Sequence, residues 1–478
     1  MDLLELCTDK TVFVDIFNDK GELGLVVFVD NEFTFYFDHP DIVIQQAHEF
    51  IARAKNVVCF DMRHFISAGL KLPEDKVVYD VRLIYGYPDS VFELATRELG
   101  SEASELGDQE RRLKANVRAC RLARVDTTKH PIRALIPNSL LRRVVRLRAV
   151  ATMALYYKAL RSHSAAVTQY EQNDYSFARA LYNIELNGIH VNVDYVKEQL
   201  KLNHPKHIAS YFRSLEETEV DGFVYTKFNP IGGKTGRIKV DRGFNCLGIP
   251  HGEPREALNS RFDGGKIYSF DFNAIDYRCI IASVEDRDFA RLYEGCEDFH
   301  HRTTSFFFDD VSDVRRKVMK ECTYVIAYGG TIETVSQKTG LSPSKSADVM
   351  RELNEKLFPV TKFREDLYKK AIVDGFVQTP HGQKVQVSQE DHPGKVLGLY
   401  AQRYSSYVFM KAFVAAEKIL HQLKSKLIFT VHDELVVDMH PDEFSFVQKI
   451  KEAMENAVGG INLSVGVNSG DDYEQASK

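Results

Sequence analysis

DVRRKVMKECTYVIAYGG, residues 313–330, has the periodicity of an α-helix with one chemically distinct face. Four of its residues follow one another at i, i+4 steps, namely Arg316, Lys320, Tyr324 and Tyr328. This spacing places them in one slowly drifting stripe along the helix. Two cations followed by two aromatic rings suit a ligand with phosphates at one end and a flat base at the other. Alone, such a stripe is more often a solvated basic face with half-buried tyrosines.

Two aspartates outside this helix favour the nucleotide interpretation. Asp271 ends the apolar strand KIYSFDF (266–272), and Asp433 lies in the turn of the hairpin SKLIFTVHDELVVDMH (425–440). Two acids on adjacent strands of one sheet can hold a pair of Mg²⁺ ions about 4 Å apart. The cations of the 313–330 helix would then neutralise the outer phosphates, and its tyrosines would offer stacking area for a sugar and a base.

The composition is that of a globular protein, and a length of 478 residues allows two or three domains. The net charge of −6 gives no sign of nucleic-acid binding, but a sum over the whole chain hides local patches. Residues 111–148 hold twelve Lys or Arg and a single acid, Asp126. Phosphate contact and a solvated basic face are both open for this segment.

Cysteine usage and the N-terminus indicate the compartment. Seven cysteines are scattered without CxxC spacing, which argues against a disulfide framework and structural zinc. The first residues are acidic where a signal peptide is basic, and no apolar run reaches membrane-spanning length. We therefore expect a soluble intracellular protein, in the cytoplasm of a bacterium or a host cell, with no membrane partner.

The first part of the chain predicts an α/β domain with a mixed sheet. Strands are expected at 11–17, 24–30, 32–38 and 56–61, with a helix at 41–54. Further on, residues 175–201 predict a helix, a turn at Gly188, a short extended piece and a second helix. Residues 203–234 show little apolar periodicity. The glycine-rich, basic stretch 232–242 could approach a phosphate chain closely or serve only as a turn.

The second part of the chain resembles the A-family, DNA polymerase I-like DNA polymerases. Over residues 175–470, six motifs occur in the family's order: TGRIKVDRGFNCLGIP (235–250), DFNAIDYR (271–278), DFHHRTT (298–304), RKVMKECTYVIAYGG (316–330), Gln402 and VHDELV (431–436). The resemblance implies a compact polymerase of viral or phage type. It would be a template-directed DNA polymerase that adds dNTPs to a primer 3′ end by two-metal nucleotidyl transfer, without proofreading.

The resemblance implies an α+β, multi-domain fold, in which an α/β RNase H-like domain of the 3′–5′ exonuclease type precedes a right-hand polymerase with palm, fingers and a short thumb. Residues 1–165 would form the exonuclease-like domain with its basic helical segment, and residues 166–478 the polymerase domain. Within the latter we expect the thumb at about 175–250, the palm at about 251–290 and 395–478, and the fingers at about 291–394.

The roles of individual residues are carried over from the matching motif positions. Asp271 and Asp433, with the backbone carbonyl of Phe272, would bind two Mg²⁺ ions, for which Mn²⁺ can substitute, and Glu434 would be a third acid beside them. Residues expected to bind the dNTP are Arg316, Lys320, Tyr324, His300 and Asp276. Residues expected to contact primer–template DNA are Tyr328, Arg237, Asn245, Gln402, His432 and Arg278.

Departures from the family pattern carry expectations of their own. Asp276 stands where the family has a longer glutamate that crowds the sugar 2′ position, so ribonucleotide exclusion is open. Tyr324 stands where phenylalanine is common, and its hydroxyl could substitute for a missing 3′-OH, which predicts weaker discrimination against dideoxynucleotides. Val325 replaces a glycine, so local helix packing must differ. A thumb of about 190–234 is short for the family, which predicts low processivity unless a processivity or replication factor assists.

The N-terminal domain resembles the family's exonuclease domain more weakly. Asp15 and Asp61 lie near predicted strand ends, but Phe17, Phe65 and Arg148 stand where the family carries metal-binding acids. A two-metal nuclease cannot lose so many carboxylates and keep its ions, so we expect a degenerate domain without proofreading, kept as a structural or DNA-holding remnant. Two rivals to the DNA polymerase interpretation remain: a single-subunit RNA or mixed-sugar polymerase, and a catalytically inactive nucleic-acid-binding subunit.

Overall fold

The computed structural model describes residues 3–19, 21–86, 90–122 and 135–477. The chain divides into two compact units, Met1–Leu186 and Asn187–Lys478. Part of the basic segment 111–148, including Asp126, lies outside the described residues. Within the described ranges, no helix is both long and apolar enough to cross a membrane.

The strands of the first unit are β1 (Thr11–Asp19), β2 (Glu22–Val29), β3 (Glu32–Asp38), β4 (Asn56–Cys59) and β5 (Val78–Asp80). Its helices are α1 (Leu3–Leu6), α2 (Pro40–Arg53), α3 (Arg63–Ser67), α4 (Val81–Ile84), α5 (Val91–Leu99), α6 (Ser104–Leu122), α8 (Asn138–Ser162), α9 (Ser164–Gln169) and α10 (Tyr175–Ile184). A 3₁₀ turn spans Gly100–Ala103, and a π-helical turn spans Tyr170–Asp174.

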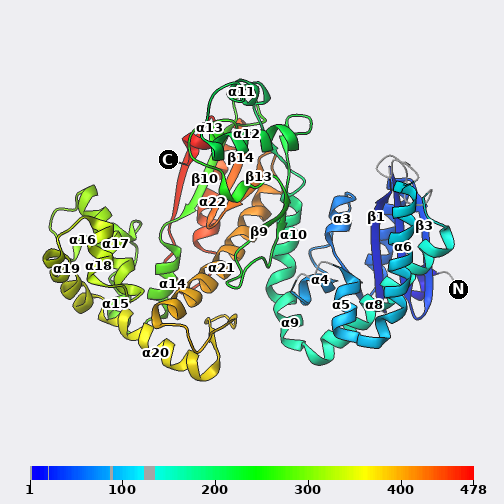
Figure 1. Ribbon diagram of the computed structural model, residues 1–478, viewed down its shortest axis with the longest axis horizontal. Helices are drawn as coiled ribbons and strands as arrows, with labels where there is room; N and C mark the ends of the chain where they lie inside the picture. The colour runs from blue at the N-terminus through cyan, green and yellow to red at the C-terminus, as the bar shows by residue number, and fades with distance from the viewer. Residues whose placement is uncertain (1–2, 20, 87–89, 123–134, 478) are drawn as a thin grey trace. The chain divides into compact units, whose positions relative to one another are not determined.

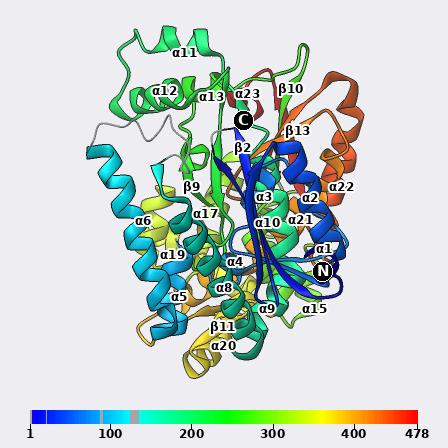
Figure 2. The same ribbon diagram turned by 90° about the vertical axis from the view of Figure 1, so that its right-hand side faces the viewer.

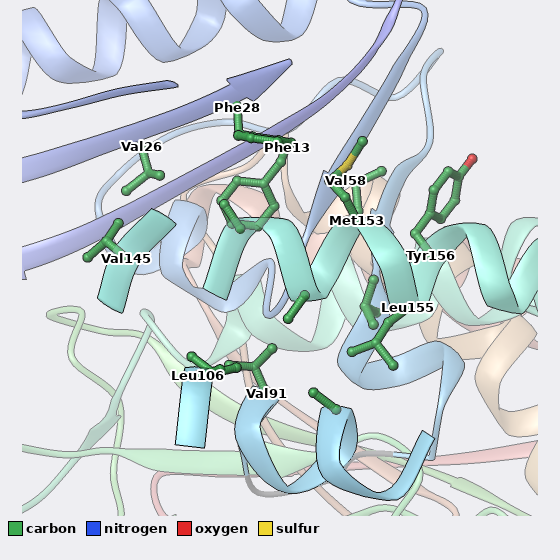
Figure 3. Packing of buried hydrophobic residues seen from close by; sticks show 14 of the residues in the cluster. Phe13, Val26, Phe28, Val58, Val91, Leu106, Val145, Met153, Leu155 and Tyr156 are labelled. Carbon is green, nitrogen blue, oxygen red and sulfur yellow. The ribbon is translucent and has the colours of Figure 1, made fainter. Parts of the chain in front are cut away.

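The sheet of the first unit is mixed, as the sequence predicts. Its order is β3-β2-β1-β4-β5, with β1 antiparallel to β2 and parallel to β4. β2 is buried on both faces because α2 and α8 both pack against it (Figure 2). Figure 3 shows the core on the α8 side, where Phe13, Val26 and Val58 of the sheet meet Met153 and Tyr156.

The first unit ends later than the sequence predicts. The predicted domain boundary lies between residues 165 and 166, whereas the compact unit includes α10. The hydroxyl of Tyr175 donates to the carbonyl of Pro73 at 3.0 Å, and the guanidinium of Arg63 lies 4.5 Å from the centre of the Tyr182 ring. Helix α10 therefore packs with the first unit.

The strands of the second unit are β6 (Ile189–His190), β7 (Phe223–Val224), β8 (Thr226–Asn229), β9 (Lys239–Gly243), β10 (Lys266–Phe272), β11 (Phe376–Gln378), β12 (Lys384–Gln386), β13 (Lys426–Val431), β14 (Glu434–Met439) and β15 (Val465–Gly470). Its helices are α11 (Val193–Gln199), α12 (Lys206–Thr218), α13 (Glu253–Glu256), α14 (Ile275–Ser283), α15 (Arg287–Arg291), α16 (Phe299–Ser305), α17 (Asp313–Ala327), α18 (Ile332–Thr339), α19 (Pro343–Lys356), α20 (Phe358–Asp374), α21 (Pro393–Leu420), α22 (Val447–Glu455) and α23 (Tyr473–Ala476). Short 3₁₀ turns span Cys246–Gly248 and Pro441–Phe446.

The second unit is built from a four-stranded sheet and a cluster of helices. The sheet order is β13-β14-β10-β15, with neighbouring strands antiparallel. Figure 1 shows α16 to α19 gathered away from this sheet, with α14 and α21 running between the two. The stretch 313–330 forms α17, as its periodicity predicts, and its buried side, including Met319, Cys322 and Ile326, faces the helical core.

Helix α12 is an element that the sequence analysis did not predict. It follows Pro205 and buries Ile208, Phe212 and Leu215, which are spaced i, i+4, i+7. Figure 2 shows it beside α11. Residues 203–234, which we described as showing little apolar periodicity, therefore do carry a narrow apolar stripe at these three positions, between polar neighbours.

Candidate active site

Strand pairing brings two aspartates together at one end of the four-stranded sheet. Asp271 of β10 lies opposite Glu434 of β14, and the backbone N–H of Phe272 lies 3.5 Å from the carbonyl oxygen of Asp433. The β13–β14 turn is tight, and its residue His432 has a φ of +55°, in the left-handed region. The turn therefore sets Asp433 beside the end of β10, as the sequence predicts.

We call the end of the sheet that holds Asp271 and Asp433 the corner. Its electrostatics disfavour the ionised form of carboxylates that have no positive charge beside them. Partial burial and the nearby carboxylates of Asp433 and Glu434 raise the pKa of Asp271 to about 7. Burial and the carboxylate of Asp276 raise the pKa of Asp433. No group of three or more His, Cys, Asp or Glu side chains poised to hold a metal ion occurs in the described ranges. Asp271 and Asp433 each offer carboxylate oxygens, which are hard donors of the kind that Mg²⁺ prefers.

Glu434 is held by hydroxyl groups. Its carboxylate accepts hydrogen bonds from Ser269 at 2.6 Å and from Tyr473 at 3.1 Å. Tyr473 lies in the last helix, α23, and the guanidinium of Arg255 lies 4.8 Å from the centre of its ring. The sequence did not indicate Ser269 and Tyr473 as site residues, because neither residue is one of the motif residues to which a role was assigned.

Helix α17 presents the predicted stripe. Lys320 is exposed, and its charge lowers the pKa of Asp271, against the larger effects of burial and the acids. The rings of Tyr324 and Tyr328 are parallel within 2°, with centroids 6.3 Å apart. Arg316 is half-buried and donates from Nε to the carboxylate of Asp298 at 2.6 Å.

Asp298 is a second residue that sequence analysis missed. It precedes α16, and its carboxylate also accepts a hydrogen bond from the backbone N–H of His301 at 2.9 Å. An aspartate immediately before a helix is a common N-cap, so the sequence carries a signal for the cap and none for the contact with Arg316.

His300 lies next to the aromatic end of the stripe. Its ring centroid is 5.5 Å from that of Tyr324. Burial and the positive charges of Lys320 and Arg316 lower the pKa of His300 to about 4, so the ring is neutral at pH 7. Its Nδ1 is buried without a hydrogen-bond partner in the described ranges, so the hydrogen-bonding capacity of this atom is not met by the described residues.

Asp276 begins α14 close to the same corner. Its Oδ2 lies 3.5 Å from Nη2 of Arg237, and its Oδ1 is buried with no hydrogen-bond partner among the described atoms. The Arg237 loop is fixed because the carbonyl of Gly236 accepts a hydrogen bond from Ser406 of α21 at 2.6 Å. The predicted sugar-facing acid and a predicted DNA contact are therefore neighbours.

The remaining predicted DNA contacts differ in their surroundings. His432 and Asn245 are exposed, and Gln402 is half-buried on α21. The carbonyl of Asn245 accepts a hydrogen bond from the hydroxyl of Tyr211 at 3.0 Å. These positions leave their side chains accessible to a ligand.

Arg278 is a correction to the sequence analysis. We predicted a DNA contact, but its guanidinium is buried and donates to four backbone carbonyls. The acceptors are Asn273 at 2.7 Å, Asn462 at 2.7 Å, Cys296 at 2.9 Å and Glu297 at 2.7 Å. Asp276 and Arg278 are two residues apart, which is about 200° around a helix, so they point to opposite sides of α14.

The end of α17 is in very close contact with the start of α21. A Cβ atom built on Gly394 would lie 1.8 Å from the carbonyl oxygen of Tyr328. Val325 packs closely against Gly330, because a Cβ atom built on Gly330 would lie 2.5 Å from Cγ1 of Val325. Glycine at positions 394 and 330 therefore allows the backbone of the turn after α17 to approach α21 and Val325 closely.

In the first unit, the two aspartates near strand ends have protein partners. The carboxylate of Asp15 lies 2.9 Å from Nδ1 of His64, and Asp61 accepts a hydrogen bond from Nη1 of Arg82 at 2.6 Å. Phe17 belongs to an aromatic cluster with Phe35 and Phe37. Phe65 is fully buried, and Arg148 donates to the carboxylate of Glu110 at 2.5 Å.

Similarity to known proteins agrees with this geometry. Residues 154–475 match the model of DNA polymerase family A. The chain is 24% identical over 310 residues to DNA polymerase I of Bacillus subtilis, covering 60% of this chain and 35% of the relative. It is 23% identical over 254 residues to the DNA polymerase of Mycobacterium phage D29, covering 52% of this chain and 41% of the relative. The chain thus spans little more than a third of the length of these relatives.

A solved structure shows the same fold. The POL domain of Pol1 from M. smegmatis, in a complex with DNA primer-template and dNTP, superposes with a TM-score of 0.74 at 16% identity. The match covers 100% of this chain and 98% of that one. The predicted α+β polymerase fold is therefore confirmed.

Proposed function

Because this chain belongs to DNA polymerase family A, we propose that it is a template-directed DNA polymerase that adds dNTPs to a primer 3′ end. The observation that carries the proposal is the pairing of β10 with β14, which sets Asp271 beside Asp433. The DNA polymerase I relatives and the phage enzyme support the same activity.

Family membership implies a divalent cation, and we propose two Mg²⁺ ions, for which Mn²⁺ can substitute. Asp271 and Asp433 would hold them, with the backbone carbonyl of Phe272. The raised pKa values of both aspartates support a site that is completed by positive charge. Bound metal supplies activation of the attacking hydroxyl and stabilisation of charge on the triphosphate. Glu434 would act as a neighbouring acid whose orientation its two hydroxyl partners fix.

The α17 stripe would bind the incoming nucleotide. Arg316 and Lys320 would neutralise the triphosphate, and Arg316 would have to exchange Asp298 for phosphate oxygens. The neutral ring of His300 would donate one hydrogen bond to the phosphates from its unpartnered Nδ1. Tyr324 would stack on the sugar and base of the dNTP, and Tyr328 would lie at the templating position.

Sugar selection would depend on two positions. Asp276 would limit space at the 2′ carbon, and its Oδ1, which has no described partner, would be available to a nearby hydroxyl. The hydroxyl of Tyr324 would take the place of a missing 3′-OH. We therefore propose weak discrimination against dideoxynucleotides.

Primer and template would be bound around the same corner. Arg237, Asn245, Gln402 and His432 would contact the strands near the primer terminus. The short region of α11 and α12 would grip little duplex, so we propose low processivity unless a processivity or replication factor assists. The match to a phage polymerase supports a compact, viral-type enzyme, which would act in the cytoplasm of a bacterium or host cell.

Primer extension tests the proposal. The protein would be given Mg²⁺, a DNA primer–template, and either dNTPs or NTPs, alongside Asp433→Ala. Extension with dNTPs that is lost in the variant and on chelation of the metal is the expected result. Efficient use of NTPs would indicate an RNA or mixed-sugar polymerase. Absence of extension with either set, with primer–template binding intact, would indicate a nucleic-acid-binding subunit.

We further propose that the first unit does not proofread. The support is the set of protein partners around Asp15 and Asp61, together with Phe17, Phe65 and Arg148 at the positions of family acids. A primer with a mismatched 3′ end should remain intact when incubated with Mg²⁺ and no dNTPs. Degradation of that primer, abolished by Asp15→Ala, would contradict this proposal.

A further inference from the structure

Helix α8 of the first unit carries positive charge and no negative charge. Residues 138–162 contain six Lys or Arg and no Asp or Glu. These six are Arg142, Arg143, Arg146, Arg148, Lys158 and Arg161. A helix of this composition attracts polyanions and repels other basic surfaces.

Packing leaves one face of α8 exposed. Figure 3 shows Val145, Met153 and Tyr156 directed toward the sheet, and Leu155 toward the neighbouring helices that carry Val91 and Leu106. At 100° per residue, a further set of residues falls within an arc of about 60° on the remaining side. The set is Ser139, Arg143, Arg146, Val150, Tyr157 and Arg161, and we call its last four members the α8 face.

The apolar members of the α8 face are unusually accessible for their type. Val150 is 40% exposed, and Tyr157 is 42% exposed. They lie between the two arginines along the helix. The order along the α8 face is therefore a cation, an aliphatic side chain, an aromatic ring and a second cation. Arg146 and Arg161 are about 22 Å apart along the axis at 1.5 Å per residue.

The two arginines of the α8 face also differ from the other cations of the helix. Four of the six are held by partners in the first unit: Arg142 by the Phe35 carbonyl at 2.8 Å, Arg143 by Glu105 at 3.1 Å, Arg148 by Glu110 at 2.5 Å and Lys158 by Glu98 at 3.1 Å. In the described ranges, neither Arg146 nor Arg161 makes an ion pair or a hydrogen bond through its side chain. Their charge is therefore available to a ligand.

We propose that the α8 face binds single-stranded nucleic acid. Arg146 and Arg161 would contact phosphates, and an unpaired base would stack on the ring of Tyr157 and against Val150. Aromatic side chains between cations are the recurring chemistry of single-strand sites of a few nucleotides. A duplex offers the same phosphates, but its base faces are already stacked on one another and cannot reach Tyr157. This proposal does not depend on the polymerase activity of the second unit.

The absence of tryptophan from the chain allows a local test. Tyr157→Trp would place the only tryptophan of this 478-residue chain on the α8 face. Titration with oligothymidylate of about 12 nucleotides, within the usual size of such sites, should quench its fluorescence saturably. Val150→Trp provides a second reporter if the first variant does not fold.

Charge variants combined with the Tyr157→Trp reporter make the test specific. The double substitution Arg146→Ala with Arg161→Ala should weaken oligonucleotide binding about tenfold or more. It should also reduce the slope of log K against log salt by about 1.4, because each single-strand phosphate contact contributes about 0.7 to that slope. The matched control, Arg53→Ala with Lys71→Ala, also removes two exposed cations from the first unit and should leave both values unchanged.

The outcomes separate the alternatives. Equal quenching by oligouridylate would support the shared single-strand chemistry, with no preference for DNA. Equal affinity for a blunt duplex of the same length would overturn the proposal, as would absence of quenching in both reporters. Primer extension by the same variants is measured in parallel, so that loss of α8 binding and loss of polymerase activity are scored independently.

Discussion

Nε of Arg316 donates a hydrogen bond to the carboxylate of Asp298 at 2.6 Å, so the cation proposed to bind the triphosphate already has an anionic partner. Both side chains are about two-fifths exposed, so the pair contributes little to stability. The Arg316–Asp298 pair instead affects ligand binding, because the triphosphate must compete with Asp298 for the guanidinium of Arg316.

We therefore expect Asp298→Asn to lower the KM for dNTP. Asparagine can still cap α16, while it gives Arg316 no negative charge, so KM should fall about two- to fivefold, in the range of one exposed ion pair. The measurement is steady-state extension at saturating primer–template. Asp288→Asn, which removes an exposed acid paired with Arg291, is the control. A raised KM would instead mean that Asp298 orients Arg316 for the phosphates.

Tyr324→Phe should restore discrimination against dideoxynucleotides. The hydroxyl of Tyr324 makes no hydrogen bond to another described residue, so its removal leaves no protein group unpaired. We expect the ratio of ddNTP to dNTP incorporation to fall about tenfold or more, the effect of one lost hydrogen bond in a closed site. Competition between the two nucleotides measures this ratio. Tyr368→Phe, on α20, is the control, and an unchanged ratio in Tyr324→Phe would contradict the proposed role.

Arg278→Met should reduce stability. Methionine has a similar length but no donors, so four backbone carbonyls would lose their partner. We expect a loss of about 2–5 kcal/mol in the free energy of unfolding, measured by urea denaturation. The exposed Arg287→Met is the matched control and should change little. A stable Arg278→Met protein with weakened DNA binding would favour the role that the sequence predicted.

His300 should make stability depend on pH in the acid range. Its pKa is about 4 in the folded state, against about 6.5 when unfolded, so the folded state binds fewer protons between these values. Stability is therefore present above pH 6.5 and is lost as pH falls toward 4, by about 2 kcal/mol at pH 5 relative to pH 7. Urea unfolding at both pH values should show this loss diminished in His300→Gln. The exposed neighbour His301→Gln should retain it.

Most residues of the candidate site could be proposed from the sequence because their motifs lie in elements with strong local patterns. Asp271 and Asp433 follow from a strand and a hairpin with alternating apolar residues, and the α17 stripe follows from its i, i+4 spacing. Asp298 and Tyr473 could not be found this way, because each acts through a partner far away in the sequence. Such contacts depend on how elements pack, which local periodicity does not encode.

Two of the differences between the sequence prediction and the structure have physical causes of the same kind. Arg278 was given a role by its place in a motif, although the helical period turns it away from Asp276. Helix α12 was missed because only Ile208, Phe212 and Leu215 mark its buried side. In both cases the direction of a side chain, rather than its type, decided the outcome.

The contact between Gly394 and the Tyr328 carbonyl also limits which substitutions this sequence can accept. Any side chain at position 394 would collide with main-chain atoms, which cannot rotate away as a side-chain tip can. Gly459, in contrast, is exposed and has nothing within 4 Å of the place where a Cβ atom would lie. In a library of all single substitutions selected for function, position 459 should accept many replacements, whereas position 394 should return almost only its original codon.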